Sequence, residues 1–136
     1  MCGIASYIGH KNAYPLILEM LKRLEYRGYD SAGIALCSQG KMKIYKEQGA
    51  IAALAESLSK QKPEGNLGIG HTRWATHGPA TKTNAHPHYS QNRRISIVHN
   101  GTVLNYYKLK EGLAKAGYEF YGETDTEILA NYLDYW

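Results

Sequence analysis

The N-terminal stretch Met1-Cys2-Gly3-Ile4 begins the first predicted strand and contains one of the two cysteines of the chain. A cysteine follows the initiator methionine, and its side chain is small enough for removal of Met1 to be plausible. Removal would leave Cys2 with a free α-amine on the carbon that bears its thiomethylene group. The pKa of an α-amine is about 7.7–8.0 and that of a thiol about 8.5, so this amine could accept the thiol proton near neutral pH. The stretch therefore predicts a nucleophile and its base on one residue, and the alternative is a cysteine that only begins a strand.

The bulk composition indicates one globular domain. The 136 residues carry a formal net charge of +4, with 43% hydrophobic and 21% charged residues, which is typical of a chain with its own core. No apolar run is long enough to span a membrane, so we expect no signal peptide and no membrane partner. With two cysteines a disulfide framework is not expected, which favours a cytoplasmic location. The basic residues are scattered and form no stripe, so we expect no nucleic-acid partner.

Short strands alternate with helices along the chain. Apolar patterning and turn residues predict strands at 2–8, 32–37, 41–47, 67–74 and 95–99, and helices at 13–27, 50–59, 106–116 and 125–134. The turn at Gln39-Gly40 predicts a hairpin between the second and third strands. Residues 75–92 are rich in Gly, Pro, Thr, His and Asn without periodicity, so we predict a long functional loop there. The pattern favours a layered α/β or α+β domain with antiparallel pairing.

Two helix starts carry capping signals. Asn105 is a candidate N-cap for the helix at 106–116, and Thr124-Asp125-Thr126-Glu127 has the pattern of a capping box for the last helix. The chain ends on that helix without a closing strand, and we expect it to be truncated at the C-terminus.

Three clusters of polar residues carry the candidate chemistry, and each lies at a strand end, a loop or a helix start. They are Cys2, the segment 71–78 that contains Arg73, and Asn100-Gly101 with Asp125 further on. Arg73 beside a donor-rich loop could hold a carboxylate by two parallel hydrogen bonds, and the alternative is a structural ion pair. The side chain of Asn100 and the backbone N–H of Gly101 could stabilise an oxyanion, although an Asn-Gly pair is more often just a turn.

Five of the six histidines lie between His71 and His99, which raises the question of a metal site. The spacing of His86 and His88 matches no zinc pattern, and no acidic or thiol residue is near them in sequence. We therefore expect no bound metal, and predict that these two histidines hold the long loop by hydrogen bonds. Arg27 is predicted to be a nearby charge that positions the N-terminal strand rather than a ligand.

Six motifs in a fixed order carry a family resemblance. They are Met-Cys-Gly-Ile (1–4), Arg-Leu-Glu-Tyr-Arg-Gly-Tyr-Asp-Ser-Ala-Gly (23–33), His-Thr-Arg-Trp-Ala-Thr-His-Gly (71–78), Asn-Ala-His-Pro-His (84–88), His-Asn-Gly (99–101) and Glu-Thr-Asp-Thr-Glu (123–127). Together they closely resemble the glutaminase domain of the glucosamine-6-phosphate synthase family, a branch of the N-terminal-nucleophile glutamine amidotransferases. The resemblance implies that residues 1–136 are the N-terminal part of a type-2 glutamine amidotransferase domain, with the isomerase domain absent. It also implies a four-layer αββα sandwich of two antiparallel sheets.

The resemblance implies catalytic roles for three positions. Cys2 is the nucleophile, and its freed α-amine is the base. Asn100 and the backbone N–H of Gly101 stabilise the oxyanion of the tetrahedral intermediate.

The resemblance also implies how glutamine is held. Arg73, helped by Thr76 and His77, binds the α-carboxylate, and Asp125 binds the α-ammonium group. Trp74 belongs to a loop that closes over bound glutamine, and Gly101 also contacts the substrate. A zwitterionic amino acid needs one fixed cation and one fixed anion, and Arg73 and Asp125 suit these roles.

The implied reaction is hydrolysis of L-glutamine to glutamate and ammonia through a thioester on Cys2, without a cofactor. In the full-length synthase the ammonia would serve to convert fructose 6-phosphate to glucosamine 6-phosphate in the isomerase domain. The full-length protein is expected to be a cytoplasmic homo-oligomer. The alternative function is that of a catalytically silent, truncated fragment that binds glutamine without turnover.

Overall fold

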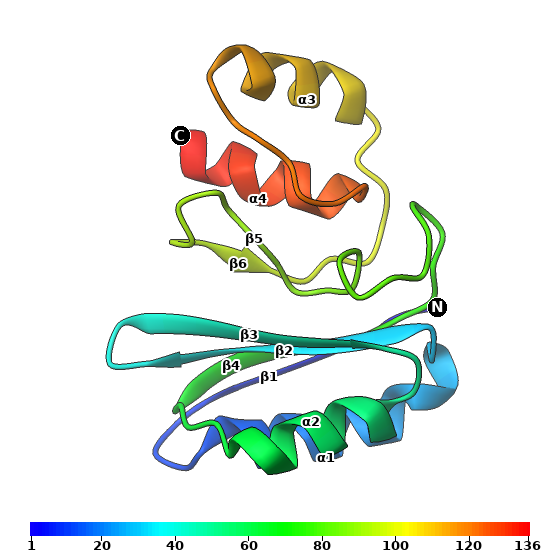
Figure 1. Cartoon of the computed structure of the whole chain (residues 1–136), viewed down its shortest axis with the longest axis vertical. Coiled ribbons are helices and arrows are strands. Elements are labelled where there is room, and N and C mark those ends of the chain that lie inside the picture. Colours follow the sequence, from blue (N-terminus) through cyan, green and yellow to red (C-terminus); the bar gives the residue numbers. More distant parts are fainter.

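The computed structural model describes residues 1–136, and its elements are stacked in four layers (Figure 1). Two helices, α1 (Ala13–Leu24) and α2 (Ile51–Gln61), form one outer layer against a four-stranded sheet. A two-stranded sheet follows. Helix α4 (Asp125–Tyr135) packs on its far side, and helix α3 (Tyr106–Lys115) packs against α4. This order confirms the predicted α+β class and the αββα arrangement of layers.

The four-stranded sheet is antiparallel throughout and has the order β1-β4-β2-β3. Its strands are β1 (Gly3–Ile8), β2 (Ser31–Ser38), β3 (Lys41–Gln48) and β4 (Leu67–Arg73). Strands β2 and β3 form the predicted hairpin. Because β1 runs antiparallel to β4, with Gly3 opposite Thr72, the start of β1 lies beside the end of β4. This register brings Cys2 next to Arg73 and Trp74.

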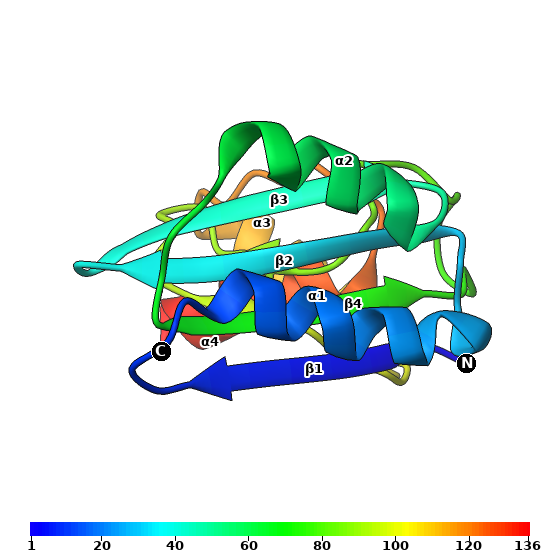
Figure 2. The ribbon, with the colours of Figure 1, turned by 90° about the horizontal axis from the view of Figure 1, so that it is seen from below.

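Helices α1 and α2 lie across one face of this sheet and form the main hydrophobic core with it (Figure 2). Ile17 and Leu21 of α1 are four residues apart, so they lie on one helical face, and both are fully buried. Leu54 and Leu58 of α2 repeat this spacing, and all four pack with strand residues such as Ile34. Full burial of one such side chain stabilises the fold by roughly 1.5–3 kcal/mol.

The second half of the chain has a much smaller apolar core. Its two-stranded sheet pairs β5 (His88–Tyr89) with β6 (Ser96–Ile97). The apolar cluster contains three buried residues, Tyr106, Leu113 and Ile128. Most of the other buried residues in this half are polar, and they include Asn84, His86, His88, Ser90, Thr124, Glu127, Asn131 and Asp134.

The segment 75–92 was predicted to lack regular structure, and this prediction is wrong at its end. His88 and Tyr89 form β5, which pairs with a β6 shorter than the predicted strand 95–99. A strand of two residues is too short to produce an apolar alternation in the sequence, so pattern analysis could not detect it.

The predicted capping box of α4 is also wrong. Thr124 occupies the N-cap position, but its side chain makes no capping hydrogen bond. Its Oγ1 lies 2.9 Å from Nε2 of His88 instead. The Glu127 carboxylate accepts hydrogen bonds from the backbone N–H groups of Tyr121 and Gly122, at 2.6 and 2.8 Å. Contacts with more distant parts of the chain therefore replace the local cap.

Other details of the helices also differ from the prediction in small ways. Helix α1 ends at Leu24 and continues as a 3₁₀ turn, Glu25–Arg27. The side chain of Asn105 precedes α3 without forming a capping hydrogen bond. None of the helices is both long enough and apolar enough to cross a membrane.

Candidate active site

A small cleft opens where β1 begins and β4 ends. The residues that line it are Cys2, Arg73, Trp74, Thr76, His77, His86, His99, Asn100, Gly101, Asp125 and Thr126. All eight residues predicted to be catalytic or substrate-binding are in this set. His86, His99 and Thr126 were not predicted there. The cleft contains residues from both halves of the fold. Cys2 precedes β1 and Arg73 ends β4, at one end of the four-stranded sheet, whereas Asp125 and Thr126 begin α4.

The thiol of Cys2 lies half-buried at the cleft, beside the backbone of Trp74. The N–H of Trp74 donates to Sγ of Cys2 at 3.2 Å, and Sγ lies 3.5 Å from the carbonyl oxygen of the same residue. The N–H of Gly3 donates to Oγ1 of Thr72 at 3.1 Å, which adds a side-chain bond to the strand pairing. The sulfur is therefore held in a fixed place relative to the end of β4.

Arg73 forms the inner wall of the cleft and is only 3% exposed. Its Nη1 donates to the carbonyl oxygen of Pro79 at 2.9 Å. Its Nη2 donates to the carbonyl oxygens of His77 and Gly78, the latter at 3.1 Å. These bonds wrap the turn at 77–79 around the guanidinium group and fix its plane, so the cleft contains a rigid cation.

Asp125 supplies the matching anion at the start of α4. Its carboxylate is nearly buried, and Oδ2 accepts a hydrogen bond from the N–H of Val103 at 2.7 Å. The positive end of the helix dipole favours a carboxylate at this position. Burial lowers the pKa of Arg73, whereas the nearby carboxylates of Asp30 and Asp125 raise it. The arginine and the aspartate therefore stabilise each other's charge across the cleft.

Asn100 and Gly101 lie next to Cys2 and present hydrogen-bond donors. Nδ2 of Asn100 donates to the carbonyl oxygen of Cys2 at 3.0 Å, and Oδ1 lies 2.9 Å from Nε2 of His71. The backbone N–H of Gly101 donates to no group of the protein. Gly101 has a φ of +148°, a conformation that favours glycine. One Nδ2 hydrogen of Asn100 and the Gly101 N–H are thus two donors without a protein acceptor.

Sequence comparison relates this chain to known proteins. A family model described as a glutamine amidotransferase domain matches residues 55–136, which is more than half of the chain. The chain belongs to the glutamine amidotransferase domain family. The resemblance inferred from the six motifs is therefore confirmed at the level of the family.

Two relatives of this amidotransferase chain share its full extent. A glutamine–fructose-6-phosphate aminotransferase [isomerizing] from Caldanaerobacter subterraneus is 55% identical over 136 residues, which are 100% of this chain and 22% of that protein. A protein of the same name from Thermus thermophilus is 53% identical over 98% of this chain and 22% of that protein. The chain thus spans about a fifth of the length of these curated relatives.

Two solved structures share the fold. A glutamine phosphoribosylpyrophosphate amidotransferase from B. subtilis, complexed with ADP and GMP, is 30% identical with a TM-score of 0.82. That match covers 98% of this chain and 29% of the other. A structure described as the allosteric regulatory enzyme of purine biosynthesis is 31% identical, has a TM-score of 0.83 and covers the same shares.

Two residues of the 23–33 motif support the part of the amidotransferase fold that carries Arg73, and pattern analysis did not predict this role. A Cβ atom on Gly28 would lie 2.7 Å from the carbonyl carbon of Arg73, so the close approach requires glycine. The N–H of Asp30 donates to the Arg73 carbonyl oxygen at 3.0 Å, and its Oδ2 accepts from the N–H of Ala75 at 2.7 Å. An Arg-Gly pair carries no local signal for such a distant contact.

Arg27 lies outside the cleft lining. Its Nη2 is 3.8 Å from Sδ of Met1, and it makes no hydrogen bond to β1. The role predicted for Arg27 in positioning the N-terminal strand stays a prediction, and this contact with Met1 is the only one that bears on it.

Three histidines form a buried column behind the cleft. The ring of His86 stacks on His71 with centroids 4.2 Å apart and meets His88 edge-on at 4.8 Å. Burial lowers the pKa of His71 to about 4, and it lowers the pKa of His86 and His88 further below the usual value. All three rings are therefore neutral near pH 7.

Hydrogen bonds of His86 and His88 hold the segment 75–92, as predicted. Nδ1 of His88 lies 3.0 Å from the hydroxyl of Tyr121, and Nδ1 of His86 accepts from the N–H of His99 at 3.4 Å. No group of three or more His, Cys, Asp or Glu side chains is arranged to hold a metal ion.

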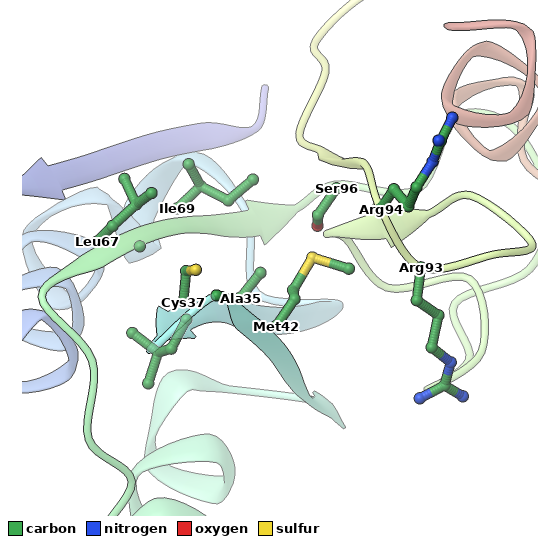
Figure 3. Close-up of a pocket in the computed structure, with 11 residues that line it drawn as sticks. Ala35, Cys37, Met42, Leu67, Ile69, Arg93, Arg94 and Ser96 are labelled. Atoms are coloured by element: carbon green, nitrogen blue, oxygen red, sulfur yellow. The ribbon is translucent and has the colours of Figure 1, made fainter. Parts of the chain in front are cut away.

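A second cavity of about 460 Å³ lies between the two sheets, and Figure 3 shows its lining. Cys37 of β2 lines this cavity together with Met42, Leu67, Ile69 and Ser96, and none of the predicted site residues takes part. The Cys37 thiol is half-buried and therefore reachable from this cavity, but it has neither an amine nor a histidine among its lining neighbours.

Proposed function

We propose that residues 1–136 form the N-terminal part of a type-2 amidotransferase domain that hydrolyses L-glutamine to glutamate and ammonia. The observation that carries this proposal is the cleft itself: a thiol, a buried cation, a buried anion and two unpaired donors line one space. The two charges suit the α-carboxylate and α-ammonium groups of an amino acid. The thiol and the donors suit attack on its side-chain amide.

Substrate specificity follows from the two buried charges. Arg73 would bind the α-carboxylate, with Thr76 and His77 beside it, and Asp125 would bind the α-ammonium group. An acid or amine that lacks either charge would leave one buried group unpaired, which is costly. Trp74, which is 43% exposed next to Cys2, is suited to cover the bound amino acid.

The chemical steps use Cys2, Asn100 and Gly101. The Cys2 sulfur attacks the side-chain carbonyl carbon of glutamine, and the carbonyl oxygen becomes an oxyanion. The free N–H groups of Asn100 and Gly101 would donate to that oxygen. Ammonia leaves with a proton from the base, a thioester remains on Cys2, and water then releases glutamate and restores the thiol.

The base in this scheme is the α-amine of Cys2 after removal of Met1. Asn100 donates to the carbonyl oxygen of Cys2, which supports the placement of this residue's backbone close to the reacting groups. No histidine ring forms a hydrogen bond with the Cys2 sulfur, so the residue's own amine is the candidate base.

The wider role of a longer protein is part of the same proposal. The ammonia would convert fructose 6-phosphate to glucosamine 6-phosphate in an isomerase domain, in a cytoplasmic homo-oligomer. This is supported by identities of 55% and 53% to proteins named as glutamine–fructose-6-phosphate aminotransferases.

A second candidate function is glutamine binding without turnover. This function would apply while Met1 remains attached to Cys2, because the Cys2 nitrogen is then a peptide nitrogen rather than an amine. The lone pair of a peptide nitrogen is delocalised into the carbonyl group and does not act as a base near neutral pH.

The two candidates are separated by glutamate release from matched cysteine variants. With Met1 removed, Cys2→Ala should abolish glutamate release and Cys37→Ala should leave it intact, because only Cys2 carries its own amine. A glutamine analogue with a diazo-ketone group should label Cys2 and not Cys37. Glutamate release that survives in Cys2→Ala would end the proposal.

The proposed binding of glutamine by Arg73 and Asp125 has a separate test. Arg73→Lys keeps the charge but loses the planar, two-pronged geometry. Loss of such a charge-assisted bond costs about 1.5–3 kcal/mol, or roughly one to two orders of magnitude in glutamine affinity. Asp125→Asn should weaken binding on the ammonium side. Unchanged affinity in either variant would remove that residue from the site.

A further inference from the structure

His71 lies directly behind Asn100, although it does not line the cleft. It belongs to β4, its side chain is fully buried, and its Nε2 is 2.9 Å from Oδ1 of Asn100. The other end of the Asn100 amide donates to the carbonyl oxygen of Cys2 at 3.0 Å. The amide is therefore held at both ends.

The partners decide which way the amide points. The Cys2 carbonyl oxygen can only accept, so Nδ2 of Asn100 must face it. Oδ1 then faces Nε2 of His71, and this nitrogen must carry a proton. With the amide turned over, two acceptors would face each other at Cys2 and two donors would face each other at His71. The turned amide would also direct an oxygen toward the place where the oxyanion forms.

The surroundings of His71 keep its ring in this one state. Nδ1 of His71 is buried and forms no well-aligned hydrogen bond. A second proton on that nitrogen would be a buried donor without a well-aligned acceptor, which is unfavourable. The backbone of His99 near the ring raises the pKa of His71, but burial lowers it by more, so the neutral ring is favoured. The stacked ring of His86 lies against the face of His71 and helps to hold the ring in its plane. The only state that satisfies the contacts is the neutral ring with its proton on Nε2.

We propose that His71 is a positioning residue for glutamine hydrolysis, because its Nε2–H holds the Asn100 amide with Nδ2 toward Cys2 and the cleft. This inference rests on the proposed function of the cleft. His71 touches neither substrate nor thiol and acts through Asn100 alone. The buried ring thereby sets the direction of a donor on the exposed surface of the cleft.

The first test needs no substitution. Nitrogen-15 NMR of the histidine rings in the full chain at pH 7 reports which ring nitrogen carries the proton. The expected result for His71 is a protonated Nε2 and an unprotonated Nδ1. A His71 ring protonated on Nδ1, or on both nitrogens, would overturn the proposal whether or not the protein is active.

The second test compares His71→Leu with His71→Gln in the chain from which Met1 has been removed. Leucine removes the donor, whereas glutamine can present an N–H group at a similar reach. In the leucine variant kcat should fall by about 10- to 100-fold, less than the roughly 10²- to 10³-fold loss expected when an oxyanion donor is removed. KM should change little, because Arg73 and Asp125 still hold the substrate. The glutamine variant should recover most of the lost kcat.

A double variant separates positioning from general damage to the fold. If His71 acts through Asn100, then adding His71→Leu to Asn100→Ala should cause no further loss of kcat. Additive losses, an unchanged kcat in His71→Leu, or a glutamine variant no better than the leucine variant would each overturn the proposal. Should His71→Leu not fold, the NMR result on the unsubstituted chain decides. An unsubstituted, Met1-free chain that releases no glutamate would instead contradict the proposed function.

Discussion

The two halves of the fold are stabilised in different ways. The four-stranded sheet and its two helices enclose a cluster of ten buried apolar residues, whereas the half formed by β5, β6, α3 and α4 encloses three. In the second half, buried polar side chains form hydrogen bonds with residues far away in the sequence. His88 pairs with Thr124, and Asn84 accepts from the backbone N–H of Glu123. The cleft lies where the two halves meet. The apolar half therefore provides a stable frame, and the polar half provides directed donors and charges.

Acidification should produce the largest difference in stability between the two halves. His71, His86 and His88 pack where the halves meet, and burial keeps them neutral in the folded chain. In the unfolded chain histidine titrates near pH 6.5. Below that pH the unfolded state binds more protons, so stability is complete above pH 6.5 and falls as the pH decreases toward about 4, where folded His71 titrates.

If the unfolded state binds three more protons than the folded state, the free energy of unfolding changes by at most about 4 kcal/mol per pH unit. Urea unfolding at pH 7.5, 6 and 5 measures the slope, and hydrogen exchange should show the second half losing protection first. His10→Asn is the matched control, because His10 is exposed and should leave the slope unchanged. A stability that does not vary between pH 7.5 and 5 would contradict the neutral histidine column.

The apolar half should respond most to loss of packing. Leu21 of α1 is fully buried, so Leu21→Ala should lower the free energy of unfolding by about 2–5 kcal/mol. Leu104, which is 95% exposed, is the control, and Leu104→Ala should change stability by less than about 0.5 kcal/mol. Chemical unfolding followed by circular dichroism gives both values. Equal effects of the two substitutions would mean that the core is not where the structure has it.

A smaller loss is expected from one buried carboxylate in the polar half. Glu127→Gln keeps the shape but turns an amide donor toward one of the two N–H groups, of Tyr121 and Gly122, that now donate to the carboxylate. One unsatisfied buried donor costs about 1–3 kcal/mol. The exposed Glu123, near the same helix start, gives the control Glu123→Gln. If thermal unfolding of both variants matches that of the parent chain, the polar network does not stabilise this half.

The smallest effect should come from a surface ion pair that joins the two halves. Nζ of Lys82 lies 2.8 Å from Oε1 of Glu47, with the lysine side chain 62% exposed. Exposed pairs of this kind contribute about 0–1 kcal/mol, so Lys82→Met should change stability within that range. A larger loss would show that the halves are held together by surface charge rather than by buried contacts.

The same contrast explains what the sequence could predict. The hairpin of β2 and β3 and the helices of the first half follow from local patterns, since a turn at Gln39-Gly40 or a four-residue apolar spacing acts on neighbouring residues. The capping box failed because Thr124 bonds to His88 and Glu127 bonds to the loop before it. Patterns of single residues carry no information on such partners.

The sequence predicted eight of the eleven residues that line the cleft, but not the geometry of the cleft. The motifs identified all the residues expected at the cleft, and the structure brings them together. The sequence did not indicate that the turn at 77–79 encloses the guanidinium group of Arg73, or that His71 contacts Asn100. Both depend on chain segments that meet only in the folded state.

The central claim is that Cys2 acts as a nucleophile with its own α-amine as the base. The most direct measurement prepares the chain with and without Met1, verifies each N-terminus by mass spectrometry, and compares glutamate release from glutamine under matched conditions. The account predicts activity only in the form without Met1, rising with pH as the amine loses its proton, for which an ordinary α-amine has a pKa of about 7.7–8.0. Equal rates from the two forms would contradict the account, because the peptide nitrogen of Cys2 in the Met1 form does not act as a base near neutral pH.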